Sequence, residues 1–217
     1  AFVSYVIHGD LQSGRPVVLC PSAIASTHHH LDFLIGKGMG LDTSNCTVIA
    51  VDALGNGLSI SPSNSQLQPR EKFPFINLRD MVKSQSLLLD LLGVNQVHAV
   101  VGASMGGMQA LQWAVAYPDC VQCVLPIATT SSLSPQSIAF DWVGREAIMA
   151  DIHFKEGKYS QDKLPEKGLE ISRMLAHITY LSEEGMRGKF GRELQEMDDY
   201  NFEFSHNFQV ESYLKYQ

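Results

Sequence analysis

The first two thirds of the chain alternate between short apolar runs and stretches with helical spacing. Apolar residues from Leu78 to Leu92 recur at helical spacing after the capping residue Asn77, and Gly93 ends this pattern. A second helical pattern runs from Met105 to Tyr117. Strand and helix therefore alternate, which is typical of a parallel sheet with right-handed crossovers. Strands are predicted at residues 2–7, 15–20, 46–52, 97–101 and 121–128.

The pattern changes after Ala128, where no further strand run follows. A polar, irregular stretch at residues 151–167 separates the predicted helices of this second part. We therefore predict a core region at 1–133 that belongs to the α/β class and a helical lid or cap region at 134–217. Helices are predicted at residues 134–148, 168–181 and 183–197.

Composition narrows the choice of class. A chain of 217 residues with 45% apolar and 18% charged residues predicts one domain, or one domain with a small appendage, around a sizeable core. A net charge of −7 without a basic run argues against nucleic acid or an anionic membrane as partner. No apolar stretch reaches membrane-spanning length. Because the chain begins within a strand-like segment and without Met, we expect upstream residues to be missing.

The four cysteines lie in apolar or strand-like contexts. Two of them form a C-x-x-C sequence, but this pair stands at a strand start, and a zinc site would need a second pair. Buried structural thiols suit a reducing cytosol, so we expect a cytoplasmic protein. The thiols concerned are Cys20, Cys46, Cys120 and Cys123.

A glycine-framed serine follows the fourth predicted strand. Residues Gly102 to Gly106 fit G-x-S-x-G, the sharp strand-to-helix turn that exposes a nucleophilic serine in α/β-hydrolase folds. Glycines on both sides remove the Cβ atoms that would collide in such a turn. Ser104 is therefore the candidate nucleophile, with a Gly-Ser helix cap as the structural alternative. No G-K-[ST] follows, which argues against a phosphate-binding P-loop.

Loops at the carboxyl ends of the strands are expected to complete the site. The N–H of Met105 follows the nucleophile and is the natural oxyanion donor. The loop after the second strand would supply the other donor, and Ala23 and Ile24 both remain candidates. Residues 53–57 follow the third strand, where open sheets place ligands, and residues 59–74 are predicted to be a surface loop.

Three consecutive histidines, His28, His29 and His30, do not predict a metal site. Neighbouring residues of a helix face different directions, and no carboxylate or cysteine stands nearby at ligand spacing. We expect a polar helix start near the mouth of the active site and no bound metal.

Several stretches resemble the homoserine O-acetyltransferase branch of the α/β-hydrolase superfamily. Two of them are VVGASMGGMQALQWAVAYPD at 100–119 and VLPIATTSSLSPQSIAFDWVGREAI at 124–148. The segments GLEISRMLAHITYLSEEGMRGKFGREL at 168–194 and FQVESYLKYQ at 208–217 resemble its lid. The resemblance covers most of the chain from about Val17 onward. It implies an α/β-hydrolase fold with a mostly parallel sheet, a helical lid insertion and C-terminal strands that are missing here.

The resemblance also implies an activity. Members of this branch transfer an acetyl group from acetyl-CoA to homoserine by a ping-pong mechanism through an acyl-serine, a step of methionine biosynthesis. Acetyl-CoA would be a substrate, so no bound cofactor is expected. Arg173 and Tyr180 match lid residues that hold the amino-acid substrate, and seven residues of helix place them on one face. The lid of this branch implies a homodimer.

Two departures keep alternatives open. The stretch DALGNGLSISPSNS at 52–65 resembles esterase-type relatives, so a serine esterase of the same fold is an alternative. In this fold an acid and then a histidine follow later strands, yet no strand run precedes His153, His177 or His206. We therefore expect the chain to stop before its catalytic Asp and His, either as a fragment or as one part of a two-chain site. A non-catalytic binding module of this fold is the second alternative.

Overall fold

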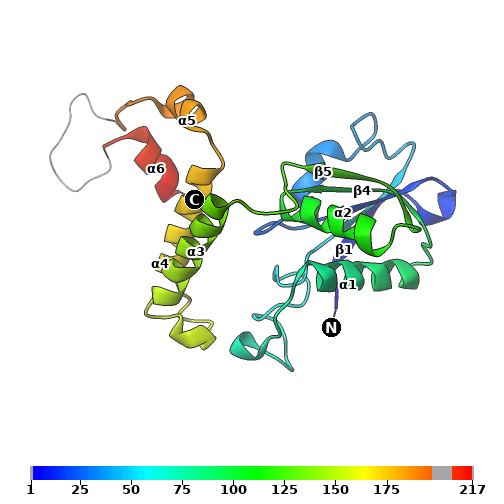
Figure 1. Ribbon diagram of the computed structural model, residues 1–217, viewed down its shortest axis with the longest axis horizontal. Helices are drawn as coiled ribbons and strands as arrows, with labels where there is room; N and C mark the ends of the chain where they lie inside the picture. Colours follow the sequence, from blue (N-terminus) through cyan, green and yellow to red (C-terminus); the bar gives the residue numbers. More distant parts are fainter. Residues whose placement is uncertain (1, 197–206, 217) are drawn as a thin grey trace. The chain divides into compact units, whose positions relative to one another are not determined.

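A computed structural model describes residues 2–196 and 207–216 of the chain. The chain divides into two compact units, Ala1–Ser132 and Leu133–Gln217. The first unit holds a five-stranded sheet in the order β1-β3-β2-β4-β5 (Figure 1). The strand β1 pairs antiparallel with β3, and the other neighbours pair in parallel, which confirms the predicted mostly parallel sheet. The strands are β1 (Tyr5–His8), β2 (Val17–Pro21), β3 (Thr47–Val51), β4 (Val97–Ala103) and β5 (Val121–Ile127).

Two α-helices of the first unit follow the predicted boundaries, and both lie on one side of the sheet (Figure 1). The helix α1 (Leu78–Leu91) begins at a capping box, because Asn77 accepts from the N–H of Asp80 and Asp80 accepts from the N–H of Asn77. Gly93 ends it with φ 71°, a conformation that glycine adopts without strain. The other helix is α2 (Met105–Ala116), and short 3-10 turns are η1 (Leu11–Ser13), η2 (His28–Leu34) and η3 (Arg70–Lys72).

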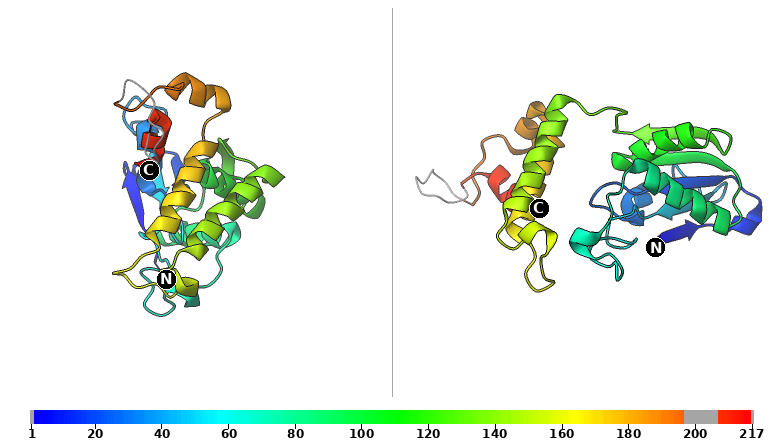
Figure 2. Two further views of the ribbon diagram at one scale, coloured as in Figure 1. Left: turned by 90° about the vertical axis from the view of Figure 1, so that its left-hand side faces the viewer. Right: turned by 60° about the horizontal axis from the view of Figure 1, so that its bottom comes forward.

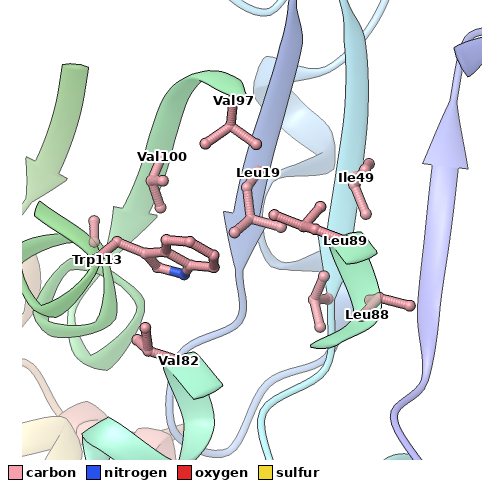
Figure 3. Close-up of a cluster of buried hydrophobic side chains, with 10 residues drawn as sticks. Leu19, Ile49, Val82, Leu88, Leu89, Val97, Val100 and Trp113 are labelled. Atoms are coloured by element: carbon pink, nitrogen blue, oxygen red, sulfur yellow. The ribbon is translucent and has the colours of Figure 1, made fainter. Parts of the chain in front are cut away.

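Alternation along the central strands builds two apolar layers, one on each face of the sheet. Leu19 and Ile49 point toward α1 and α2, where Trp113 fills the space between the helices and the sheet (Figure 3). Their neighbours Val18 and Val48 point to the opposite face, where they pack with Leu31 of η2 and with Ile35, the residue after it. Because successive side chains of a strand point to opposite faces, β2 and β3 must be apolar at nearly every position.

The last strand is less buried than its sequence predicts. On β5 the Cys123 residue is exposed and Leu125 is 54% exposed, so the expectation of a buried strand is wrong. In the described part of the chain β5 stands at the edge of the sheet and pairs only with β4. Of the four thiols expected to be buried, Cys20 is buried, Cys46 and Cys120 are half-buried, and Cys123 is exposed. Cys20 does behave as a structural thiol, because burial raises the pKa of its thiol to about 12.

The segment at residues 59–74, predicted as a surface loop, is only partly one. Ser59 and Ser61 are buried, with at most 1% of their surface exposed. Ser59 donates to the carbonyl oxygen of Asp52 at 2.8 Å and accepts from the N–H of Ser4 at 2.9 Å. Serine is polar, but a hydroxyl with both a donor and an acceptor partner can be buried at little cost. This loop is therefore attached to the end of β3.

The second unit is helical, as the lid pattern predicts. Two helices, α3 (Pro135–Ala150) and α4 (Glu166–Thr179), run antiparallel along each other (Figure 2). Gly168 allows the close approach, because a Cβ there would collide with the backbone of Ala147 and Ile148. The remaining elements are η4 (Lys155–Gly157), α5 (Glu183–Phe190) and α6 (Gln209–Lys215).

The helix predicted at residues 183–197 is shorter in the structure. The helix α5 ends at Phe190, because Gly191 takes φ 53° and ψ −131° and leaves the helical region. Residue 197 lies outside the described residues. Among the residues that the structure describes, no helix is both long and apolar enough to cross a membrane.

Candidate active site

Ser104 lies between β4 and α2, at the sharp turn that joins them. Its backbone takes φ 54° and ψ −123°, a conformation that residues with a Cβ atom rarely adopt. The turn is held on both sides, since the N–H of Ser104 donates to Ile127 O at 3.0 Å and its carbonyl accepts from the N–H of Met108 at 3.1 Å. Ser104 is an exposed residue. The geometry is that of a strand–nucleophile–helix turn, and the catalytic role of Ser104 stays a prediction.

Close backbone contacts explain why glycine surrounds this serine. A Cβ on Gly102 would collide with the carbonyl of Gly106 on the first turn of the helix. A Cβ on Gly106 would collide with the carbonyl oxygen of Pro21, at the end of β2. The first turn of α2 therefore lies directly against both β4 and the loop that leaves β2.

That loop carries the two candidates for the second oxyanion donor. Ala23 is buried at 3% exposure, whereas Ile24 is 67% exposed. Ser22, which precedes them, is fixed by two hydrogen bonds, one to the last residue of β3 and one from Ala53, two residues beyond that strand. Its N–H donates to Val51 O and its Oγ accepts from the N–H of Ala53, both at 2.9 Å. Met105 is the first residue of α2, where N–H groups have no acceptor within the helix.

A buried carboxylate beside this loop was not found by sequence reasoning. Asp52, at the end of β3, has a fully buried side chain and binds His28 of η2 twice. Its oxygens accept from the His28 backbone N–H at 2.8 Å and lie 2.7 Å from Nδ1 of the His28 ring. Asn56 donates to the same carboxylate at 2.8 Å.

The ionisation of Asp52 follows from these contacts. Burial acts to raise the pKa of its carboxyl, but the hydrogen bonds from His28 and Asn56 outweigh it and hold the pKa below its usual range. The sequence held one signal for a polar site here, namely a polar residue at the carboxyl end of each of the two strands β2 and β3. The polar helix start predicted at His28 is a 3-10 turn capped by Thr27, whose hydroxyl accepts from the N–H of His29.

The two lid residues named by the resemblance lie in the second unit. Arg173 is part of α4, and Tyr180, 67% exposed, follows its last residue. His177 lies between them, with its ring 5.3 Å from that of Tyr180 and its Nδ1 3.0 Å from the hydroxyl of Tyr213. Burial and the positive charges of Arg173 and Lys189 lower the pKa of His177. The hydrogen bond between His177 and Tyr213 links α4 to α6.

Two carboxylates of the second unit have partners close in sequence. Glu170 on α4 binds Lys167 at 2.7 Å. His153 donates its backbone N–H to Asp151, and His206 lies outside the described residues. The prediction that the catalytic acid and base lie outside this chain is not tested by these contacts. No group of three metal-binding side chains occurs within residues 2–196 and 207–216.

Comparison with known proteins identifies the class that this fold and turn define. Residues 15–209 match the model of the alpha/beta hydrolase fold family, so the chain belongs to this family. It is similar to homoserine O-acetyltransferase from Desulfotalea psychrophila, with 46% identity over 192 residues. A second similar protein is homoserine O-acetyltransferase from Zymomonas mobilis, with 48% identity over 190 residues. These alignments cover 86% and 85% of this chain but 49% and 51% of the relatives.

Solved structures of two kinds resemble the chain. Homoserine O-acetyltransferase from Bacillus anthracis matches with a TM-score of 0.86 and 26% identity, over 99% of this chain and 64% of that one. An acetylester hydrolase from Corynebacterium glutamicum matches with a TM-score of 0.81 and 32% identity, over 86% of this chain and 55% of that one. The chain spans about half the length of the curated relatives it matches.

Proposed function

We propose that the full-length protein transfers an acetyl group from acetyl-CoA to the hydroxyl of homoserine, or of a similar small alcohol. The observation that carries this proposal is the exposed, strained Ser104 at the head of α2, in a chain 46% and 48% identical to two homoserine O-acetyltransferases. Such a turn aims a hydroxyl away from the sheet and places helix N–H groups beside it. Acetyl-CoA acts as a substrate of this reaction and not as a bound cofactor.

The reaction proceeds in two steps through an ester on the enzyme. The Ser104 hydroxyl attacks the thioester carbonyl and loses its proton to a general base. The N–H of Met105 and an N–H of the loop at Ala23–Ile24 stabilise the oxyanion, which collapses and releases CoA with the returned proton. The homoserine hydroxyl then attacks the acetyl ester, its proton goes to the base, and Ser104 is restored.

Arg173 and Tyr180 hold the acceptor in this proposal. Both lie on the same helical segment, and the planar guanidinium of arginine can bind the carboxylate of homoserine in a bidentate manner. The tyrosine is two-thirds exposed, so its hydroxyl is available to a ligand. An acceptor held in place competes with water for the acyl-enzyme, which is what separates a transferase from a hydrolase.

A serine esterase is the second candidate, and one observation favours it. The acetylester hydrolase from Corynebacterium glutamicum shares the fold at 32% identity. The stretch at 52–65 also resembles esterase-type relatives, and in this chain Asn56 and His28 of η2 donate to the Asp52 carboxylate at its start. Both candidates form the same acyl-serine and differ only in whether water or homoserine removes the acetyl group.

We also propose that the protein is a cytoplasmic homodimer whose two copies contact each other through the second unit. The free cysteines of the described residues suit a reducing compartment. Helices of the second unit expose large apolar side chains to a degree that supports association with another copy. On α3 and α4 these residues, each between 49% and 55% exposed, are Ile138, Trp142, Val143, Leu169 and Ile171.

The decisive experiment uses the full-length protein with acetyl-CoA, with and without L-homoserine. Free CoA and O-acetylhomoserine are followed together. Homoserine-dependent release of CoA with matching product supports the transferase, whereas fast hydrolysis of simple acetyl esters without any homoserine effect supports the esterase. Ser104→Ala should lower either activity by about 10³-fold or more. The control is Ser132→Ala, which replaces an exposed serine in the same unit. Full activity in Ser104→Ala, or no activity in the wild-type protein, would reject a catalytic Ser104.

A further inference from the structure

A chain of buried side-chain amides leads from the core to the loop beside Ser104. Gln109 on α2 and Gln85 on α1 are both at most 1% exposed. The indole Nε1 of Trp113 donates to Gln85 Oε1 at 2.7 Å, and Gln85 Nε2 donates to Gln109 Oε1 at 2.6 Å. Because each amide has one oxygen and one nitrogen, these two bonds set the orientation of both glutamines. The nitrogen of Gln109 must then point away from Gln85.

That nitrogen joins the loop after β2 to the turn that holds Ser104. Gln109 Nε2 donates to the carbonyl oxygen of Ser22 at 3.0 Å and to that of Met105 at 3.3 Å. Ser22 is 87 residues away in sequence, so this bond is a tertiary link between two parts of the proposed site. The carbonyl of Pro21, one residue earlier, lies against the α-carbon of Gly106 on the same helical turn.

The bond to Ser22 also controls the N–H of Ala23. The carbonyl of Ser22 and the N–H of Ala23 belong to one planar trans peptide group, in which the two bonds point in opposite directions. Fixing the carbonyl toward Gln109 therefore fixes the direction of this N–H. The rest of Ser22 is also held, since its N–H and its Oγ both bind at the end of β3.

We propose that Ala23, and not Ile24, supplies the second oxyanion N–H, and that Gln109 is the positioning residue that orients it. The inference rests on the proposed acyl-serine function. An oxyanion donor is effective when its direction is set before charge develops, because no reorganisation is then needed during the reaction. Among the described contacts, the Ser22–Ala23 peptide is bonded to the nucleophile helix itself. The burial of the two candidates also favours Ala23, because Ala23 is buried in the protein and Ile24 is exposed to solvent.

The competing explanation is that the glutamines only stabilise the contact between α1 and α2. Gln85 offers a matched control, because it is equally buried and belongs to the same hydrogen-bonded chain but has no recorded bond to the loop. Methionine has a similar length and volume to glutamine and cannot donate a hydrogen bond, so Gln109→Met and Gln85→Met remove the polar contacts without leaving a large cavity.

The test follows acylation of the full-length protein by p-nitrophenyl acetate in single-turnover experiments, alongside thermal stability. Gln109→Met should slow acylation by about 10- to 100-fold while KM changes by less than about twofold, because the donor acts on the transition state and not on the bound ester. Gln85→Met should keep its acylation rate within about threefold even where it is equally destabilised, because the bonds from Gln109 Nε2 to the Ser22 and Met105 carbonyls still hold the Gln109 amide. Equal rate losses in the two variants would overturn the inference.

The outcomes separate this inference from the proposed function. If Ser104→Ala retains acylation, the acyl-serine function itself fails. If Ser104→Ala is inactive but the two glutamine variants behave alike, the function stands and the role of Gln109 is rejected. Should Gln109→Met not fold, the pair Gln109→Leu and Gln85→Leu decides in the same way, since leucine is apolar, has a similar volume and cannot donate to the Ser22 carbonyl.

Discussion

The two units bury their apolar side chains to very different degrees. In the first unit, Leu19, Ile49 and Val100 have no exposed surface, and Trp113 is 1% exposed. Within the described part of the second unit, Phe190 is the one large apolar side chain that is buried, with 8% of its surface exposed. The first unit therefore has a core of its own, and the second consists of packed helices with exposed apolar faces.

This difference matches what each unit is proposed to do. A strained residue such as Ser104 persists only where the surrounding packing determines its conformation, and the first unit supplies strands and a helix that do so. Recognition of a substrate or of a second copy needs exposed side chains, which the second unit offers. Matched substitutions in the two units test this contrast.

The two tryptophans of the chain lie one in each unit and give the sharpest test. Trp113→Ala should lower the free energy of unfolding by about 3–5 kcal/mol, because it leaves a cavity and removes the donor to Gln85. Trp142, which is 55% exposed and lies 5.6 Å from the Arg145 guanidinium, should cost less than about 1 kcal/mol when replaced by alanine. Urea denaturation of both variants measures this, and equal losses would contradict the contrast.

Two helical glycines provide the next test. Gly106→Ala should destabilise the protein by about 1–3 kcal/mol, because the added Cβ meets the Pro21 carbonyl, a backbone atom that cannot rotate away. Gly188 on α5 has no heavy atom within 4 Å of an added Cβ, so Gly188→Ala should raise stability by up to about 1 kcal/mol through helix propensity. Thermal unfolding compares the two. If Gly106→Ala left the stability unchanged, the loop after β2 would not contact the helix closely.

Arg173→Lys tests the second unit in function. Lysine keeps the charge but loses the planar fork, so KM for homoserine should rise about tenfold while acylation by acetyl-CoA stays within about twofold. Arg187→Lys on α5, where Arg187 pairs with Glu183 on the surface, is the control and should change neither quantity. Equal losses in acylation and acceptor use would reject the carboxylate-anchor role of Arg173.

The smallest effect concerns acid sensitivity. Because the folded-state pKa of Asp52 is depressed, its charge stabilises the fold above the unfolded-state value of about 4, and this contribution is lost as the pH falls through the folded pKa. The unfolding free energy of the wild type should therefore decline below about pH 5, and that of Asp52→Asn should decline less steeply. The two slopes should differ by at most about 1.4 kcal/mol per pH unit. Asp141→Asn, on the exposed surface of α3, is the control. Parallel pH curves for wild type and Asp52→Asn would refute the assignment.

Local patterns in the chain were sufficient for most elements. The β-branched run at residues 46–52 became β3, and Asn77 and Gly93 marked the ends of α1, because caps and periodicity act over a few residues. The turn at Gly102–Gly106 was predictable for the same reason, since its glycines answer contacts within one strand and one helical turn. The end of α5 at Gly191 was missed, although a glycine was the available signal.

Contacts between distant residues could not be predicted. Nothing local to His28 or Asp52 indicates that they meet, and the same is true of Gln85 and Gln109, since each pair is separated by 24 residues and joined only by the fold. The exposure of β5 was also missed, because a strand's apolar composition does not say whether another element covers it.

The order of strands and helices, the glycine-framed turn and the place of Ser104 at its centre follow from the local sequence, because they depend on backbone conformation and short-range periodicity. Which side chains are held around that turn depends on tertiary packing. The burial of Asp52 against His28 and the amide chain from Trp113 to Ser22 arise from packing β2, β3, α1 and α2 together, and a buried polar group is stable only where that packing brings it a partner.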